Sequence, residues 1–350
     1  MSSQAPEAAA IVSSPTWSAK NLALVCCPVC GGELEIAAQT LRCPHCGRNF
    51  ESDNGIALLF WPAGDQASRG DVTGIVKAFY EENPFPNYDD VESSFTLREK
   101  ARKGIFAQLL DDNVPLTAKV LEVGCGTGQL SNFLGECTTR TVIGADLCLN
   151  SLRLAQEFKL RNALQNVTFY QINLFRPPFR AESFDVVLSN GVLHHTSDPY
   201  GGFKSIVRLL KRGGVILVGL YNTYGRLTTD FRRTMIRVFG DKAAVLDPHL
   251  RKAALNEGRR RAWLYDQYKH PHESKHTFGE VLEWFEQCGI EFITSIPTCT
   301  GSPLPRTELL FDQPEPQPTL MARFLTQAGM LLKGGAEGGL FIMIGRKTAQ

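Results

Sequence analysis

Short apolar runs recur along most of the chain and are separated by longer mixed stretches. Seven of them have the length of buried strands: residues 120–123, 141–145, 166–172, 184–189, 214–220, 291–296 and 338–345. Helices of about a dozen residues fit between the earlier runs. Strands that alternate with such helices predict an α/β fold with a doubly wound, mostly parallel sheet of seven strands. In sheets of this kind, ligands bind at the carboxyl ends of the strands.

Three glycines at alternate positions follow the first run. In Glu122-Val123-Gly124-Cys125-Gly126-Thr127-Gly128 the backbone is expected to turn tightly before Gln129 and Leu130 open a helix. The absence of side chains at the glycines lets a ligand lie against main-chain N–H groups. This order of strand, loop and helix predicts a site for a nucleotide-like cofactor, with an ordinary glycine-rich turn as the alternative.

Two acidic residues narrow the kind of cofactor. Glu122 precedes the first glycine by two residues, where it suits a cationic ligand and would repel a pyrophosphate. Asp146 ends the second run, where it can accept hydrogen bonds from ribose hydroxyls. The spacing is also G-x-G-x-G and not the G-x-G-x-x-G of dinucleotide enzymes. The pattern E-V-G-C-G-T-G-Q-L followed by G-A-D-L resembles the cofactor site of class I S-adenosylmethionine-dependent methyltransferases.

This resemblance implies a Rossmann-like fold, S-adenosyl-L-methionine as the cofactor and a set of binding residues. The set is Glu122, Gly124, Cys125, Gly126, Thr127, Gly128, Asp146, Leu147, Asn173, Leu174 and Asn190. Asn173 ends the third run, where the family usually has an acidic residue that binds the adenine amino group. An amide can still form a hydrogen bond there but supplies no charge.

The loop after the fourth run carries the candidate base. Methyl transfer from a sulfonium requires alignment of the acceptor, and a base only when the acceptor must lose a proton. His194 and His195 lie in this loop, and imidazole titrates near working pH. His194 is the preferred candidate. The alternative is that both histidines shape the cofactor pocket, as in relatives with a similar G-V-L-H-H-T sequence.

Four of the ten cysteines form two C-x-x-C pairs near the N-terminus. Cys27 and Cys30 form one pair, Cys43 and Cys46 the other, and a glycine follows each pair. Four thiolates at this spacing predict a closed, structural zinc site in a small zinc ribbon. Cys26 is an alternative first ligand, and a redox-active pair is the competing interpretation. The cysteine pattern also indicates a reducing, cytoplasmic location.

The predicted organisation has four parts. They are a flexible tail at 1–21, the zinc ribbon at 22–62, a linker and lid segment at 63–115, and the methyltransferase domain at 116–350 with acceptor-side insertions at 222–275 and 297–337. Within the lid segment, residues 79–90 interleave aromatics, acids and two prolines and are expected to be irregular. This stretch could fold over the cofactor or acceptor as a lid, or clasp the linker to the core.

The first insertion is locally basic, although the net charge of the whole chain is only +1. Between residues 222 and 262, ten arginines and lysines face four acids. Such a surplus could hold a phosphate-bearing, carboxylated or nucleic-acid acceptor, or form a solvated face. Residues 263–276 combine aromatics, histidines and a glutamate. They predict a polar and aromatic acceptor pocket in preference to a second metal site, because Pro271 interrupts any helical ligand spacing.

The absence of two motifs of nucleic-acid methyltransferases limits the class of methyl acceptor. Residues 190–193 are not the N-P-P-Y-like tetrapeptide of adenine amino methyltransferases, and this region lacks the cysteine nucleophile of pyrimidine-C5 enzymes. No apolar run reaches the roughly 18 residues that span a membrane. We therefore predict a methyltransferase acting on a small or polar metabolite. An RNA methyltransferase is the alternative, since a zinc ribbon before such a core is similar to the ribosomal RNA guanine-N1 enzymes. A non-catalytic cofactor-binding scaffold is a third possibility, and the sequence predicts no oligomeric state.

Overall fold

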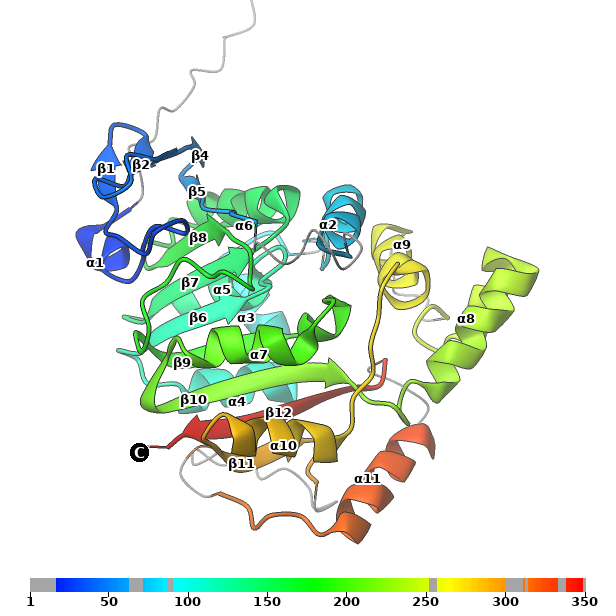
Figure 1. Ribbon diagram of the computed structural model, residues 1–350. Helices are drawn as coiled ribbons and strands as arrows, with labels where there is room; N and C mark the ends of the chain where they lie inside the picture. Colours follow the sequence, from blue (N-terminus) through cyan, green and yellow to red (C-terminus); the bar gives the residue numbers. More distant parts are fainter. Residues whose placement is uncertain are drawn as a thin grey trace, which may run out of the picture.

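The computed structural model describes residues 17–62, 72–86, 88, 91–136, 138–251, 257–299, 311, 314–332 and 338–348. Its centre is a nine-stranded sheet in the order β11-β12-β10-β9-β6-β7-β8-β5-β4 (Figure 1). The seven predicted strands are β6 Lys119–Val123, β7 Thr141–Asp146, β8 Val167–Gln171, β9 Phe184–Asn190, β10 Leu210–Tyr221, β11 Ile290–Ile296 and β12 Leu340–Lys347. The first five run parallel, and β12 lies antiparallel between β10 and β11. The predicted fold class is thereby confirmed.

Helices cover both faces of this sheet. The strands are continuous apolar runs in the sequence because both of their faces are buried. On β6, Val120 packs into one core cluster and Leu121 into the cluster on the other face, and both are fully buried. One face is covered by α7 Pro199–Val207 and α10 Phe278–Gln287. The other face is covered by α3 Ser94–Ala101, α4 Ile105–Asn113, α5 Gln129–Gly135 and α6 Leu149–Arg161.

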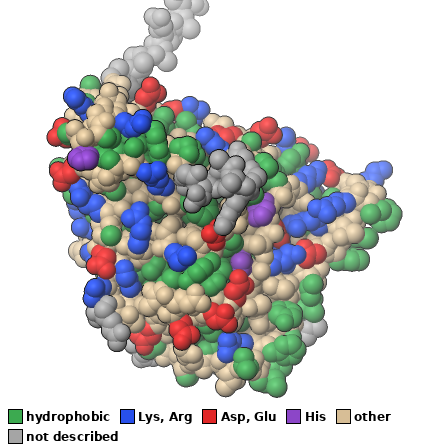
Figure 2. Space-filling model, viewed as in Figure 1, with side chains coloured by type: hydrophobic (Ala, Val, Ile, Leu, Met, Phe, Trp, Pro, Cys, Tyr) green, Lys and Arg blue, Asp and Glu red, His purple; other side chains and the backbone are tan. Residues whose placement is uncertain are grey.

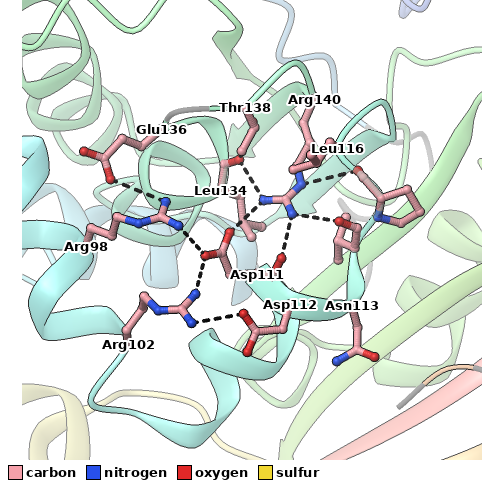
Figure 3. Close-up of polar contacts among 12 residues, drawn as sticks. Arg98, Arg102, Asp111, Asp112, Asn113, Leu116, Leu134, Glu136, Thr138 and Arg140 are labelled. Atoms are coloured by element: carbon pink, nitrogen blue, oxygen red, sulfur yellow. Dashed lines mark hydrogen bonds and ion pairs between the residues drawn. The ribbon is translucent and has the colours of Figure 1, made fainter. Parts of the chain in front are cut away.

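A buried arginine fastens α3 and α4 to the sheet (Figure 3). The Arg140 side chain is fully buried, lies 3.1 Å from the Asp111 carboxylate and donates to the backbone carbonyls of Asp111 and Val114 at 2.8 and 2.7 Å. Arg98 and Arg102 approach the same carboxylate from α3 and the turn after it, at 2.8 and 2.6 Å. The buried charges are therefore paired and hydrogen-bonded, as burial requires.

The N-terminal ribbon is joined to the large sheet and is not a separate unit. Its own small sheet contains β1 Glu35–Ala37, β2 Thr40–Arg42 and β3 Asn49–Phe50. The next hairpin, β4 Ser52–Asp53 and β5 Ile56–Leu58, extends the nine-stranded sheet, with β5 parallel to β8. We expected residues 54–60 to complete the ribbon, but their strand pairs with the core because the edge of β8 was open to a partner.

The predicted tail is also shorter than expected. Trp17 is buried, α1 spans Ala19–Leu22, and the Asn21 amide donates to the Thr168 hydroxyl at 2.6 Å. The prediction of a tail up to residue 21 is therefore wrong for residues 17–21, because these side chains dock onto β8. Residues 1–16 lie outside the described part of the chain.

The lid segment begins with a regular helix. Helix α2 runs Val72–Glu82, so the expectation of irregular structure is wrong for residues 79–82. The helix ends before Pro84 and Pro86, because a proline disfavours helical backbone at the residue directly before it and cannot donate the next helical hydrogen bond. Of the predicted linker and lid segment at 63–115, residues 63–71 are outside the described residues.

The two insertions form a further set of helices beside the carboxyl ends of the strands (Figure 1). The first contains α8 Leu227–Phe239, η3 Asp241–Leu246, α9 Glu257–Leu264 and η4 Tyr265–Lys269, and the second contains α11 Leu320–Leu332. Within the described ranges, every helix is too short or too polar to cross a membrane.

Candidate functional site

The glycine loop connects β6 to α5 in a backbone conformation that residues with a side chain rarely adopt. Gly124, Gly126 and Gly128 have φ values of 77°, 52° and 71°. A Cβ on Gly124 would lie 2.2 Å from a Val192 methyl, and one on Gly128 would lie 2.6 Å from the Ala155 Cβ. The glycines are thus required by close packing of the loop against its neighbours.

Two carboxylates face the space beside this loop. Glu122 is buried, and its carboxylate accepts a hydrogen bond from the Ser131 hydroxyl. Asp146 accepts from the backbone N–H groups of Gly126 and Cys148, both at 2.8 Å. Burial raises the pKa of Glu122 to about 8 and raises the pKa of Asp146 above its usual value. A ligand that brings a positive charge or hydroxyl donors would compensate both groups.

The lid segment covers the glycine loop. The Phe85 carbonyl oxygen would lie 2.5 Å from a Cβ on Gly126, and the Thr127 hydroxyl donates to the Pro86 carbonyl. The Tyr88 hydroxyl donates to the Thr127 carbonyl at 2.8 Å. The segment therefore packs on the loop, and Phe85 and Pro86 also line the cavity beside it.

A second set of contacts anchors α2 to the helix that follows Asp146. The Glu81 carboxylate accepts from the backbone N–H groups of Leu149 and Asn150, both at 3.0 Å. These N–H groups belong to the first turn of α6, where a carboxylate is favoured by the unpaired donors and the helix dipole. The lid is therefore held at the glycine loop and at α6.

A cavity of about 1010 Å³ lies between the lid, the glycine loop and the first insertion. Most predicted cofactor residues line it: Glu122, Gly124, Cys125, Gly126, Asp146, Leu147, Asn173, Leu174 and Asn190. Thr127 and Gly128 do not, because Thr127 is buried under the lid and Gly128 begins α5. The volume is at the upper end of the range of about 300–1,000 Å³ for small-molecule sites. It can hold a nucleoside cofactor together with a small second ligand.

The cavity lining also contains a polar cluster from α2, β10 and η4. The Tyr80 hydroxyl donates to Asp266 Oδ1 at 3.0 Å. The Gln267 amide donates to Asp266 Oδ2 and to the Tyr221 hydroxyl, both at 2.9 Å. Asp266 is buried, and burial raises its pKa above the usual value. This carboxylate can accept a proton from a ligand in the cavity.

The two candidate histidines occupy different positions. His195 lines the cavity, whereas His194 is fully buried behind it with its ring 3.9 Å from the Tyr221 ring, measured between centroids. Among the described residues, neither ring nitrogen of His194 has a hydrogen-bond partner. The preference for His194 as the base is therefore wrong by position, because its ring packs between aromatic neighbours and does not reach the cavity.

His195 has a defined hydrogen bond and an aromatic neighbour. Its Nδ1 lies 2.9 Å from the His272 carbonyl oxygen, so a neutral ring would carry the proton on Nδ1 and leave Nε2 as an acceptor. Its ring lies 3.7 Å from the His270 ring, centroid to centroid. Burial lowers the pKa of His195 to about 4 and of His270 to about 3. Both rings are neutral at pH 7, and the His270 ring packs against the His195 ring, which lines the cavity.

The basic character of the first insertion is partly neutralised inside the protein. Arg226 is fully buried, donates from Nε to the Glu273 carboxylate at 3.0 Å and lies over the Tyr221 ring at 3.8 Å. Arg233 reaches the same carboxylate at 2.7 Å. These two arginines therefore position Glu273 and the cavity wall, and they are not part of a surface for an anionic acceptor.

The four predicted cysteines converge on one point. The Sγ atoms of Cys27, Cys30, Cys43 and Cys46 all lie within 4.8 Å of one another, and the Cys27–Cys46 and Cys30–Cys43 pairs are 3.7 and 3.5 Å apart. A tetrahedron with Zn–S bonds of 2.3 Å has sulfurs about 3.8 Å apart, so the set fits zinc. Four converging sulfurs favour a metal site over a redox pair.

Cys26 takes a different direction from the four ligands. Its backbone N–H donates to the Pro178 carbonyl at 2.9 Å, and the metal-ligand cluster forms with Cys27 in the first position. Backbone N–H groups of Val29 and Gly32 point at the sulfurs of Cys27 and Cys30, both at 3.4 Å. Such contacts favour the thiolate form of a ligand.

Several wall residues were not among the predicted site residues. Tyr80, Tyr221 and Asp266 line the cavity but belong to three elements far apart in sequence. The aromatic and acidic character of residues 79–90 and 263–276 was a signal for two of them. Tyr221 ends the fifth parallel strand, and the rule that ligands bind at strand carboxyl ends would have identified it.

Comparisons with known proteins agree with this geometry. Residues 121–218 match the family model described as a methyltransferase domain, and residues 20–51 match the model of a Trm112p-like protein. The ubiquinone biosynthesis O-methyltransferase of Haemophilus ducreyi is 34% identical over 108 residues, which cover 30% of this chain and 45% of that protein. The demethylmenaquinone methyltransferase of Lactococcus lactis is 36% identical over 100 residues, covering 28% of this chain and 40% of that protein.

The similarity is confined to part of each relative. The chain spans about half the length of the curated relatives it matches. Among solved structures, PKMT2 from Rickettsia typhi in complex with AdoHcy is similar with a TM-score of 0.48 and 16% identity, over 70% of this chain and 52% of that chain. Residues 121–218 thus match a methyltransferase domain and residues 20–51 a Trm112p-like protein, in agreement with the methyltransferase domain and the N-terminal zinc ribbon that the glycine loop and the cysteine pairs predicted.

Proposed function

We propose that the protein is an S-adenosylmethionine-dependent methyltransferase that acts on a small, polar or aromatic acceptor. The observation that carries this proposal is a single cavity lined by two chemically different groups of side chains, here called the first and the second wall. Glu122 and Asp146, from β6 and β7, are the first wall, and Tyr80, Asp266 and His195, from the lid helix, η4 and the loop after β9, are the second. This division suits a cationic nucleoside cofactor on one side and an acceptor on the other.

The residues of the first wall fit the cofactor. S-adenosylmethionine, when bound, supplies an activated methyl group on a sulfonium sulfur. Asp146 would accept hydrogen bonds from ribose hydroxyls, Glu122 would face the cationic part of the ligand, and Asn173 would face the adenine. The Asn173 amide already donates to the Trp61 carbonyl at 3.1 Å, so the end of the ribbon helps to orient it.

The second wall would align the acceptor and remove its proton. When the acceptor heteroatom carries a hydrogen, its electron pair forms the new bond to the methyl carbon, and the S–C electron pair remains on sulfur. The Asp266 carboxylate is then the proton acceptor, directly or through the Tyr80 hydroxyl that is bonded to it at 3.0 Å. His195 forms the aromatic side of the same wall, and the His270 ring packs against it.

The lining of the cavity favours a small acceptor over RNA. The lid and the first insertion both line it, and the buried Arg226 and the part-buried Arg233 are committed to Glu273. We further propose that the four cysteines hold a structural zinc ion. Its folding energy would stabilise the short ribbon and, through β5, the edge of β8.

The acceptor class can be tested by methyl transfer from labelled S-adenosylmethionine. Purified protein would be incubated with the small-molecule, RNA and protein fractions of a strain that lacks the gene. We expect label in the small-molecule fraction with the native protein and none with Asp146→Ala, whose cofactor affinity by calorimetry should be severely reduced. Label in RNA alone would establish the alternative acceptor, and equal cofactor affinity in the variant would refute the role of Asp146.

A further inference from the structure

Two helices on one edge of the protein carry large exposed apolar side chains. They are Leu227, Phe231, Val238 and Phe239 on α8, 47–65% exposed, and Leu320, Met321, Phe324 and Leu325 on α11, 53–77% exposed. Figure 2 shows hydrophobic side chains gathered over this edge, where Figure 1 places both helices. Tyr224, which precedes α8, lies beside Phe324 of α11, with the ring centroids 6.4 Å apart. The exposed apolar side chains of both helices are here called the α8/α11 surface.

Helix α8 is amphipathic with its apolar stripe directed outward. At 100° per residue, Leu227, Phe231 and Val238 fall within about 40° of one another on the helix. The opposite side is packed on the protein through the buried residues Thr229 and Ile236. The outward apolar stripe is therefore not needed for packing within the described part of the chain.

Positive charge borders this stripe at Arg237, which is exposed and lies beside the stripe by the same helical geometry. Asp230, the acid within α8, is engaged by Lys275 at 2.5 Å. The α11 sequence contains no acidic residue. An apolar centre with an exposed arginine at its border and no uncommitted carboxylate on either helix is complementary to a surface that is apolar in depth and negative at its edge.

We propose that the α8/α11 surface binds the face of an anionic phospholipid bilayer. The aromatic and aliphatic side chains would enter the boundary between headgroups and acyl chains, and Arg237 would contact lipid phosphates. A second copy of the chain is a poorer partner, because its α8/α11 surface offers no uncommitted acid on either helix to pair with Arg237. This binding requires neither cofactor nor acceptor, so it is independent of the proposed methyl transfer.

The insertion that carries α8 also contributes residues to the lining of the cavity. His249 and Trp263 line the cavity and belong to the same insertion as α8. Docking through α8 would hold this side of the cavity close to the bilayer. A membrane-bound acceptor pool would then reach the site at high local concentration.

The test uses the full chain and vesicles of phosphatidylcholine, with and without phosphatidylglycerol, in a sedimentation assay at low salt. We expect the native protein to sediment with the anionic vesicles and to be released as salt is raised. The double variant Phe231→Asp and Val238→Asp should bind at least tenfold more weakly. Arg237→Glu should selectively weaken binding to the anionic vesicles.

The control is Phe95→Asp on α3, because Phe95 is 72% exposed and lies outside the α8/α11 surface. It should sediment like the native protein, and circular dichroism should show that every variant is folded. Equal binding to neutral vesicles, or loss of binding in the control, would overturn the proposal. A dimer that the double variant dissociates, together with no vesicle binding by the native protein, would assign the surface to self-association and would also overturn it.

Discussion

The Tyr80 hydroxyl donates a hydrogen bond to the Asp266 carboxylate across 3.0 Å, although the two residues are 186 positions apart. Tyr80 belongs to the lid helix α2, and Asp266 belongs to η4 in the first insertion. The bond thus joins the two segments that cover the cavity, at the place where an acceptor would lose its proton. It connects closure of the site to the proposed chemistry.

Replacing Tyr80 or Asp266 should separate closure of the site from removal of the acceptor proton. Asp266→Asn keeps the shape but removes the proton acceptor, so we expect kcat to fall by about 10²–10⁴-fold for an acceptor that carries a proton. Tyr80→Phe removes only the hydroxyl and should mainly raise KM, because the lid is held less firmly. Steady-state kinetics with the acceptor identified by labelling would measure both.

His195→Gln serves as the comparison for this pair, since His195 shares the wall but has a strongly lowered pKa. We expect it to lower kcat less than Asp266→Asn does. An Asp266→Asn protein with native kcat, or a larger loss in His195→Gln, would transfer the role of base to the histidine.

Cofactor binding should depend on pH through Glu122. Burial raises the pKa of this carboxyl to about 8 in the free protein, and a cationic ligand favours its charged form. Affinity for S-adenosylmethionine should therefore rise with pH below 8, by up to about tenfold per pH unit, and level off above it. Calorimetry in buffers of different ionisation enthalpy should detect proton release on binding at pH 7.

The same group should affect the stability of the ligand-free protein in the opposite direction. A carboxyl whose pKa is raised on folding stabilises the folded state below its unfolded pKa, and this contribution is lost as pH rises toward 8. Glu122→Gln should abolish both the proton release and this part of the pH dependence. A native pH profile in the variant would contradict the assignment.

The cysteine cluster should couple the ribbon to the methyltransferase core. Cys27→Ser should lower the bound zinc, measured by atomic absorption, and should destabilise the ribbon because the metal supplies its folding energy. Since β5 pairs with β8 and Trp61 contacts Asn173, cofactor affinity should also fall. Cys26→Ser is the matched control and should retain zinc. Zinc loss with unchanged cofactor affinity would show that the two parts are energetically independent.

The buried Arg140 should contribute far more to stability than an exposed ion pair. Arg140→Met leaves the backbone carbonyls of Asp111 and Val114 without this donor, and we expect a loss of about 3–5 kcal/mol in the free energy of unfolding. Arg161→Met breaks the exposed pair with Glu157 and should cost at most about 0.5 kcal/mol. Urea titrations compare the two. Similar losses would mean that the network in Figure 3 is not a stabilising centre.

The sequence by itself determined the sheet, the glycine loop and the metal ligands, because each of these depends on local patterns. Apolar runs such as 120–123 identify buried strands, alternate glycines before Gln129 identify the loop, and paired cysteines reveal their ligand spacing. Asp146 could be assigned in the same way, since it directly follows a strand whose carboxyl end lies at the binding edge.

Only the tertiary structure decided what faces the cavity. His194 and His195 are adjacent in sequence, yet one packs behind the wall and the other lines it, because one turn of 3₁₀ helix directs them differently. The sequence places Arg226 in a locally basic stretch, but its side chain is buried against Glu273, 47 positions away. The union of β5 with β8 and the contact of Tyr80 with Asp266 likewise depend on long-range packing, which no local pattern encodes.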